Sequence, residues 1–175
     1  MGDDIQLPEY HTAVEQYLKA KLPWLNSITS YPETETALTT PCAFFQVMDW
    51  DKADKQPMNG QLGVVLKCQL IAVLGVDDPA HQLEIRQAAM AVSMAVDGAR
   101  FGLPVEPAVL VSAQPDAFNP ELDAYAAWSI EFNHRIDVGM DEYQPEGLTP
   151  TMVHVGYSPD IGGDNSDKYE QVVHE

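Results

Sequence analysis

Two long stretches in which apolar side chains recur at every second position constrain the fold more than any other feature of this sequence. One runs from Gln61 to Val76 and the other from Asp123 to Val138. Successive side chains of a β-strand point to opposite faces of a sheet, so a period of two predicts two strands. Both stretches exceed the usual strand length of about 5–6 residues. The two strands are therefore expected to bend or to project beyond the sheet.

The remaining elements follow from helical spacing, proline positions and short apolar runs. We expect helices over 8–22 and from Pro79 to Val96, a brief strand over 26–31, strands over 42–47 and 105–113, and a polar loop from Trp50 to Gly60. The order of helix, strands, helix and strands predicts an α+β domain, in which helices pack on one face of a mainly antiparallel sheet.

Several residues of these strands are expected in the core rather than in a chemical site. His134 lies on the apolar face of the last strand, where a histidine is more often a hydrogen-bonded core side chain than a ligand or base. Cys42 and Cys68 lack CxxC spacing, so we expect reduced core thiols rather than a disulfide or a structural zinc site. The other predicted core residues are the aromatic side chains of Phe44, Phe45, Trp128 and Phe132.

The character of the chain changes after Gly139. Residues 139–175 contain eight acids and one cation, Lys168, which gives this segment a net charge of −7. Prolines and the pair Gly162-Gly163 interrupt it, although Met152–Tyr157 could add one strand. We therefore expect two parts, an α+β domain over 1–139 and an extended acidic C-terminal arm over 140–175 that becomes ordered against a partner.

The charge balance excludes several classes of partner. The chain of 175 residues has 9 Lys and Arg against 27 Asp and Glu, a net charge of −18. DNA-binding proteins neutralise phosphates with Lys and Arg, so groove reading is not expected, and an anionic membrane surface is disfavoured for the same reason. At 45% hydrophobic residues the chain is too apolar for a wholly disordered acidic protein. No stretch approaches the roughly 18 apolar residues of a membrane span, and the first residues do not resemble a signal peptide, so we expect folding in the cytoplasm.

The sequence offers no strong catalytic, cofactor or metal site. Hard cations require several carboxylates, but the acids near Trp50 lack the glycine and glutamate of a calcium loop, and a second acidic group in the tail is a similarly weak candidate. The five histidines show neither HxxxH nor HExxH spacing, and the sequence has no phosphate-binding or nucleophile motif. We therefore predict a protein that is not an enzyme and uses no cofactor or metal. The two acidic groups are Asp49, Asp51 and Asp54, and Asp160, Asp164 and Asp167.

An aromatic side chain in polar surroundings is a candidate interface anchor. Trp50 lies among charged residues and Met58 follows in the same polar segment, so we expect 49–60 to contact another protein. Folding of Trp50 back onto the domain is an equal alternative. The tail supplies the other candidates, and the predicted interface residues are Trp50, Asp51, Met58, Tyr157, Ile161 and Tyr169.

A set of segments, taken in order, resembles a known protein family. The segments are a helix ending Leu22-Pro23-Trp24, then Pro41–Phe45, the long strand Gly63–Gly75, the alanine-rich helix, Trp128–Gly139, and Val155–Gly162 in the tail. This order resembles that of the tail terminator proteins of long-tailed bacteriophages, especially those of Mu-like phages. The resemblance covers most of the chain as an order of elements, and related head-tail connector proteins share a similar plan.

The resemblance implies a small α+β domain that forms a hexameric ring on the end of the finished tail tube. Such a ring stops polymerisation of the tube and presents the surface that joins the head. The implied partners are further copies of the chain, the tail tube protein and a neck or head-tail connector protein, while genomic DNA passes through the channel without specific binding. The implied location is the tail or neck of the virion, after assembly in the host cytoplasm and without any membrane partner.

In a ring around DNA, the net charge of −18 would acquire a role. Acidic side chains in the channel would repel phosphate and keep DNA from sticking as it slides. Ordinary solubility is the simpler explanation of the same charge. Long strands and an acidic arm are compatible with a ring, because an unpaired strand edge pairs readily with another chain and a closed ring leaves no free edge.

Three other functions stay open at this point. A head-tail connector or neck-completion protein would share the fold and the oligomer but bind on the portal side. A cation-dependent enzyme would need one of the acidic groups to converge with a histidine in a pocket. An acidic mimic of nucleic acid would need a DNA-binding protein as its target.

Overall fold

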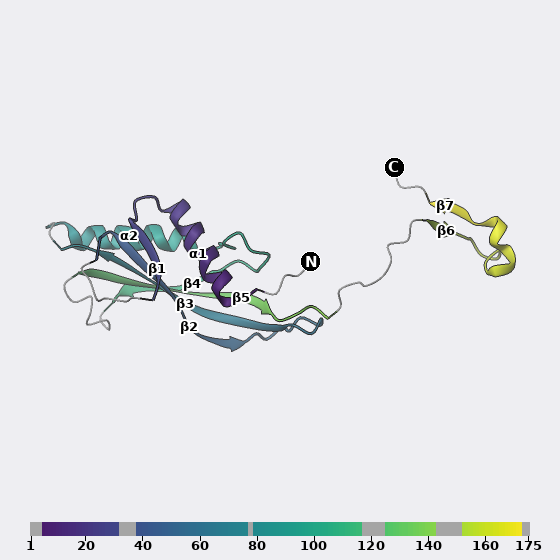
Figure 1. Cartoon of the computed structure of the whole chain (residues 1–175), viewed down its shortest axis with the longest axis horizontal. Coiled ribbons are helices and arrows are strands. Elements are labelled where there is room, and N and C mark those ends of the chain that lie inside the picture. Colours follow the sequence, from purple (N-terminus) through teal and green to yellow (C-terminus); the bar gives the residue numbers. More distant parts are fainter. Residues whose placement is uncertain (1–4, 32–37, 77–78, 117–124, 143–151, 173–175) are drawn as a thin grey trace. The chain divides into compact units, whose positions relative to one another are not determined.

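A five-stranded sheet forms the framework of the first of two units into which the chain divides, Met1–Tyr143 and Gln144–Glu175. The computed structural model describes residues 5–31, 38–76, 79–116, 125–142 and 152–172 (Figure 1). The sheet consists of β1 (Ser27–Ser30), β2 (Cys42–Lys52), β3 (Leu62–Leu74), β4 (Val109–Pro115) and β5 (Ala126–Val138).

The strands lie in the order β1-β2-β3-β5-β4, and every neighbouring pair is antiparallel except β1 and β2. The two stretches with a period of two become β3 and β5, each 13 residues long. They pair along their whole length, from Leu62 opposite Val138 to Leu74 opposite Ala126. The prediction of a mainly antiparallel sheet is confirmed, and the long strands form its centre.

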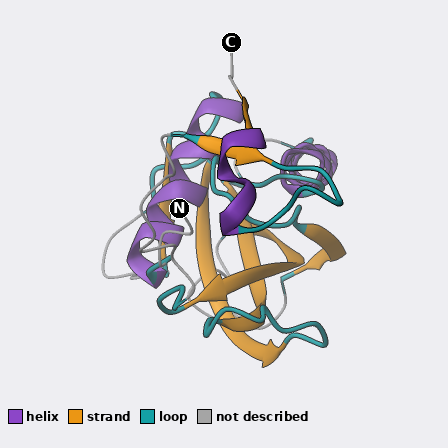
Figure 2. Cartoon of the chain, turned by 90° about the vertical axis from the view of Figure 1, so that its right-hand side faces the viewer, coloured by secondary structure: helices purple, strands orange, loops and turns teal. Residues whose placement is uncertain are grey.

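The two helices described in this unit, α1 (Leu7–Lys21) and α2 (His81–Val96), cover the same face of the sheet. In Figure 1 both helices lie above the central strands, and Figure 2 shows the same chain turned by 90° and coloured by secondary structure. The side of α1 that meets the sheet carries Tyr10, Val14 and Leu18, at helical spacing. A glycine ends α2 soon after Val96, because Gly98 has φ +77° and donates its N–H to the carbonyl of Ala108.

The two faces of the sheet differ as the alternation predicts. On the helix side, the alternate residues Val64, Leu66, Cys68, Leu70 and Ala72 of β3 are buried in the main core. On the open side, polar side chains bond across the strands, where Gln46 donates to Gln69 and Gln69 donates to Ser129. A smaller apolar cluster shares that open side and consists of Cys42, Phe44, Ile71 and Val73. The predicted core positions of Phe44, Phe45, Phe132 and both cysteines are confirmed.

Three sequence-based predictions need correction. The loop expected from Trp50 begins later, because β2 continues to Lys52 with Asp49 and Asp51 both paired to Lys67 of β3. The strand expected over 105–113 begins only at Val109, and Pro107 shortly before it has no N–H to donate to a ladder. Trp128 is half-buried rather than fully buried, with the guanidinium of Arg86 stacked 4.9 Å from its ring centre.

The second unit, described over 152–172, contains a two-stranded antiparallel sheet of β6 (Val153–Val155) and β7 (Glu170–Val172) with the 3-10 helix η2 (Gly163–Lys168) between them. The strand predicted over Met152–Tyr157 is confirmed as β6, whereas its partner β7 was not expected. Tyr169 holds the unit together, because its hydroxyl accepts the N–H of Gly162 at 2.8 Å.

Candidate interaction surfaces

An apolar groove of about 310 Å³ lies where β3 and β5 run past the start of α1. Side chains from four elements or their flanks line it, among them Leu7, Trp50, Leu62, Val64, Ile136 and Val138. The groove continues the helix-covered face of the sheet, because Leu62 and Val64 belong to the same row as the buried Leu66. The core of the unit therefore opens to solvent at this end of the sheet.

The structure separates two of the predicted interface residues, Trp50 and Asp51, onto opposite faces of β2. Trp50 lines the groove and keeps 60% of its surface exposed. Asp51 points away from the groove, and its carboxylate lies 2.9 Å from the Lys67 ammonium, which Asp49 also contacts at 2.9 Å. These two carboxylates raise the pKa of the half-exposed Lys67. Trp50 is therefore part of an apolar surface and Asp51 part of a charged pair.

A second exposed apolar surface runs along the outer face of α2. Leu83, Met90 and Met94 are 70%, 64% and 76% exposed. Together with Gln87 they occupy positions i, i+4, i+7 and i+11, which we call the outer stripe. At about 100° per residue these four positions face one direction, opposite to the buried residues around Val92. Helical spacing of Leu83, Met90 and Met94 is readable in the sequence, but only the structure shows that other residues face the sheet.

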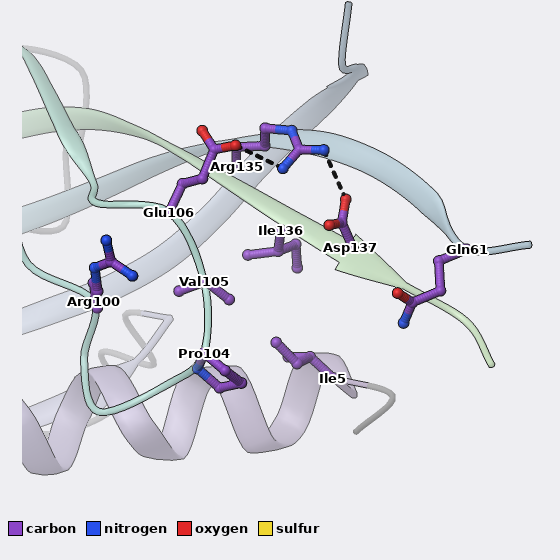
Figure 3. A pocket seen from close by; sticks show the side chains of 9 residues that line it. All are labelled: Ile5, Gln61, Arg100, Pro104, Val105, Glu106, Arg135, Ile136 and Asp137. Carbon is purple, nitrogen blue, oxygen red and sulfur yellow. Dashed lines mark hydrogen bonds and ion pairs between the residues drawn. The ribbon is translucent and has the colours of Figure 1, made fainter. Parts of the chain in front are cut away.

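A charged pocket of about 260 Å³ shares the lining residues Ile5 and Ile136 with the groove (Figure 3). Arg135 is its central residue, with one guanidinium nitrogen 2.8 Å from Glu106 and the other 3.0 Å from Asp137. The same side chain also donates to the carbonyl of Lys55 at 3.1 Å. Figure 3 shows Arg135 between the two carboxylates, so its positive charge is paired on both sides. The arrangement ties the loop before β4 to β5, and the described lining residues include no serine, cysteine or other nucleophile activated by a base.

A hydrogen-bonded chain of three titratable side chains crosses the core between α1 and the sheet. His134 donates from Nε2 to the Glu106 carbonyl at 2.7 Å, since that oxygen only accepts, and its Nδ1 therefore accepts the Tyr10 hydroxyl at 2.8 Å. The Cys68 thiol lies 3.7 Å from the same hydroxyl and can donate to it. All three are buried.

Burial sets the protonation of this chain. It raises the pKa of Tyr10, raises the pKa of the Cys68 thiol to about 12 and lowers the pKa of His134. The three groups are therefore neutral at physiological pH. The expectation that His134 is a hydrogen-bonded core side chain is confirmed.

A second group joins a serine, a histidine and an acid but in the wrong order for nucleophilic catalysis. Ser30 donates its hydroxyl proton to Glu15 at 2.6 Å, so His11 Nδ1, 2.9 Å away, is the donor to the Ser30 oxygen. A hydrolase triad places the histidine between the hydroxyl and the acid, so that it can remove the hydroxyl proton. Burial lowers the pKa of His11. The group fastens α1 to β1.

The two acidic clusters weighed as cation sites do not converge on a metal centre. Asp49 and Asp51 are held by Lys67, and Asp160 pairs with Lys168 at 2.6 Å. Within the residues that the structure describes, no group of three His, Cys, Asp or Glu side chains is placed to hold a metal ion.

The remaining predicted interface residues occupy different surroundings. Met58 is 90% exposed in the turn between β2 and β3. In the second unit, Tyr157 and Ile161 are exposed, whereas Tyr169 is half-buried and its ring packs against Gly156. Tyr169 therefore serves the interior of its own unit, whereas Tyr157 and Ile161 are exposed, as are Met152, Val153 and Val172.

Among the helices of the described ranges, none is long and apolar enough to cross a membrane. No protein-family model matches the chain, and none of the curated proteins matches it either.

Proposed function

We propose that this chain is a structural protein of a bacteriophage virion, which forms a ring on the end of the tail tube, ends tube polymerisation and provides the surface that joins the head. One observation carries the proposal. The first unit exposes two apolar surfaces in different places, the groove at the Leu62–Val138 end of the sheet and the outer stripe of α2. Exposed apolar patches on a folded domain mark interaction sites.

The arrangement of elements supports the proposal further. Its α+β fold, with helices on one face of a mainly antiparallel sheet, agrees with the fold that the resemblance to tail terminators implies. The charged side chains that could serve an enzyme are paired with one another. Arg135 binds the two carboxylates of its pocket, and Lys67 binds Asp49 and Asp51 of β2. Assembly is therefore the function that the exposed surfaces favour over catalysis.

Tube capping tests the proposal directly. Adding the purified chain to polymerising tail tube protein of a Mu-like phage should shorten the tubes and leave a ring on one end, visible by negative-stain electron microscopy. Rings that form without binding the tube end would instead favour a head-tail connector. Tubes of unchanged length and a chain that never leaves the monomeric state would contradict both.

Two parts of the chain are proposed as contact sites within this assembly. The segment around Trp50 and Met58 is proposed to contact the tube or a neighbouring copy, and normal capping by a variant with both Trp50→Ala and Met58→Ala would refute that assignment. The second unit is proposed to bind a neighbour or a neck protein through Tyr157 and Ile161. A chain ending after Gly139 should then fold but assemble poorly, and full assembly of that shortened chain would exclude this role.

A further inference from the structure

We infer that the outer stripe of α2 in one copy docks into the apolar groove of the next copy, so that copies associate head to tail. The inference rests on the proposed ring and names the two surfaces that build it. The occupant of the groove is therefore a second copy of this chain. The stripe side chains are Leu83, Met90 and Met94, and the groove presents Trp50, Leu62 and Val138.

The chemistry of the groove selects an apolar occupant. All of the described side chains that line it are apolar, and none of them offers a hydrogen-bond acceptor or an ionised group. A pocket for a small metabolite usually carries a few convergent polar groups that fix the ligand's orientation. An amphipathic helix, by contrast, binds by laying its apolar face into such a groove, with anchors at helical spacing. The long, flexible side chains of Met90 and Met94 suit a groove of irregular shape.

The charge distribution favours α2 over other parts of the chain as the occupant. The 16 residues of α2 include one acid, Glu84, and one base, Arg86, so the helix is neutral in a chain of net charge −18. Two copies can meet through this face without bringing acidic surfaces together. The second unit also exposes apolar side chains, but Asp160, Asp164 and other acids accompany them. In the groove these acids would meet only apolar described side chains and would lose water without gaining a partner.

The positions of the two surfaces make the contact heterologous. The groove lies at the Leu62–Val138 end of the sheet, whereas α2 begins near the opposite end, where Glu84 and Leu74 line the same hollow. Stripe and groove are different surfaces of one chain, so each copy can donate its stripe to one neighbour and accept the stripe of another. Contacts of this kind generate closed rings when the rotation between copies closes.

Site-specific cross-linking tests the contact. Equimolar Met94→Cys and Leu62→Cys chains, one carrying a size tag, are mixed across a concentration series and treated with a short bis-maleimide. The native thiols of Cys42 and Cys68 are buried and stay silent. We expect a cross-link between one Met94→Cys chain and one Leu62→Cys chain in the mixture. Either variant alone should stay at the mass of one chain. Met140→Cys replaces Met94→Cys in the matched control. The Met140 side chain is 78% exposed and belongs to neither the stripe nor the groove.

Three cross-linking results overturn the inference. Cross-linking of Met94→Cys to itself would mean that two α2 helices pack about a two-fold axis. Equal cross-linking of the Met140→Cys control would mean random collision. Absence of any cross-link between Met94→Cys and Leu62→Cys at every concentration would mean that the stripe does not enter the groove.

Serine substitution measures the strength of the contact. Burying a methionine that is 64% or 76% exposed should tighten association roughly fivefold to fiftyfold per side chain. Met90→Ser with Met94→Ser should therefore weaken association at least about thirtyfold, while Met140→Ser leaves it unchanged. The same mixtures separate this inference from the proposed function. Tubes capped by rings that lack the cross-link overturn the contact alone, and cross-linked rings that fail to cap tubes overturn the function alone.

Discussion

Replacing Tyr10 by phenylalanine removes one hydroxyl from the hydrogen-bonded chain in the core and leaves the ring in place. Two groups then lose their partner, because His134 Nδ1 accepts from this hydroxyl at 2.8 Å and the Cys68 thiol lies 3.7 Å from it. Both are buried, so water cannot replace the missing group. His134 is still held in place by its bond to the Glu106 carbonyl.

The expected loss of stability follows from these contacts. A buried polar group left without a partner costs about 1–3 kcal/mol, and the unsatisfied ring nitrogen of His134 is the larger contribution because thiols bond weakly. The aromatic contacts of Tyr10 with Phe45 and Phe101, at 6.1 Å and 6.4 Å between ring centres, survive the change. We therefore expect the free energy of unfolding of the first unit to fall by about 1–3 kcal/mol.

Urea unfolding of the whole chain, followed by tryptophan fluorescence, measures this loss. Tyr17→Phe is the matched control, since it makes the same change on the same helix, at a half-buried ring that packs on Phe101, and should shift stability by less than about 0.5 kcal/mol. Nitrogen NMR of the wild-type imidazole should show the proton of His134 on Nε2. Equal stability of Tyr10→Phe and Tyr17→Phe, or a proton on Nδ1, would refute the reasoning.

Three further predictions concern protonation, backbone space and thiols. Burial lowers the pKa of His11 and His134 below the unfolded value of about 6.5. Their contribution to stability is therefore present above that pH and is lost as the pH falls through the lower folded pKa values. The urea midpoint should drop between pH 7.5 and 5.5, and an unchanged or higher midpoint would contradict this. Gly156→Ala should change the NMR signals of the second unit and leave those of the first unit unaltered, because the added carbon would lie 2.8 Å from the Tyr169 ring. The control Gly163→Ala adds a carbon that meets nothing within 4 Å, so it should leave the spectrum of both units unchanged. The Cys68 thiol, with its pKa raised to about 12, should react with iodoacetamide only after unfolding, and rapid labelling of the native chain would show that the core is open.

The parts of the fold that periodicity determines were predictable from the sequence. Strands β3 and β5, helices α1 and α2, and the burial of His134 follow from side chains that repeat at a period of two or along one helix face. These local patterns also predict one covered and one open sheet face, which the structure confirms.

Features that depend on pairing between distant segments were not predictable. The extension of β2 to Lys52 brings Asp49 and Asp51 into contact with Lys67 of β3. The residues near Asp49 alone do not indicate which residues of β3 pair with β2. The same holds for β7, whose partner β6 precedes it by more than a dozen residues.

One residue of the groove was identifiable from the sequence, because Trp50 is an aromatic side chain in polar surroundings. The structure adds that Trp50 lines an apolar groove. The outer stripe of α2 escaped prediction for a physical reason. A helix that is apolar on two sides has the sequence pattern of a fully buried helix. Which of its two apolar sides is exposed becomes clear only once its contacts with the sheet are known.

The central claim is that copies of this chain associate through the stripe and the groove into a ring that ends a tail tube. Light-scattering mass across a concentration series, with negative-stain images of the same samples alone and with polymerising tube protein, tests it most directly. Against the 19.3 kDa chain, the account predicts a six-fold mass with ring images that Met90→Ser with Met94→Ser abolishes and Met140→Ser preserves. A mass of one chain at every concentration, with no ring on the tube ends, would contradict it.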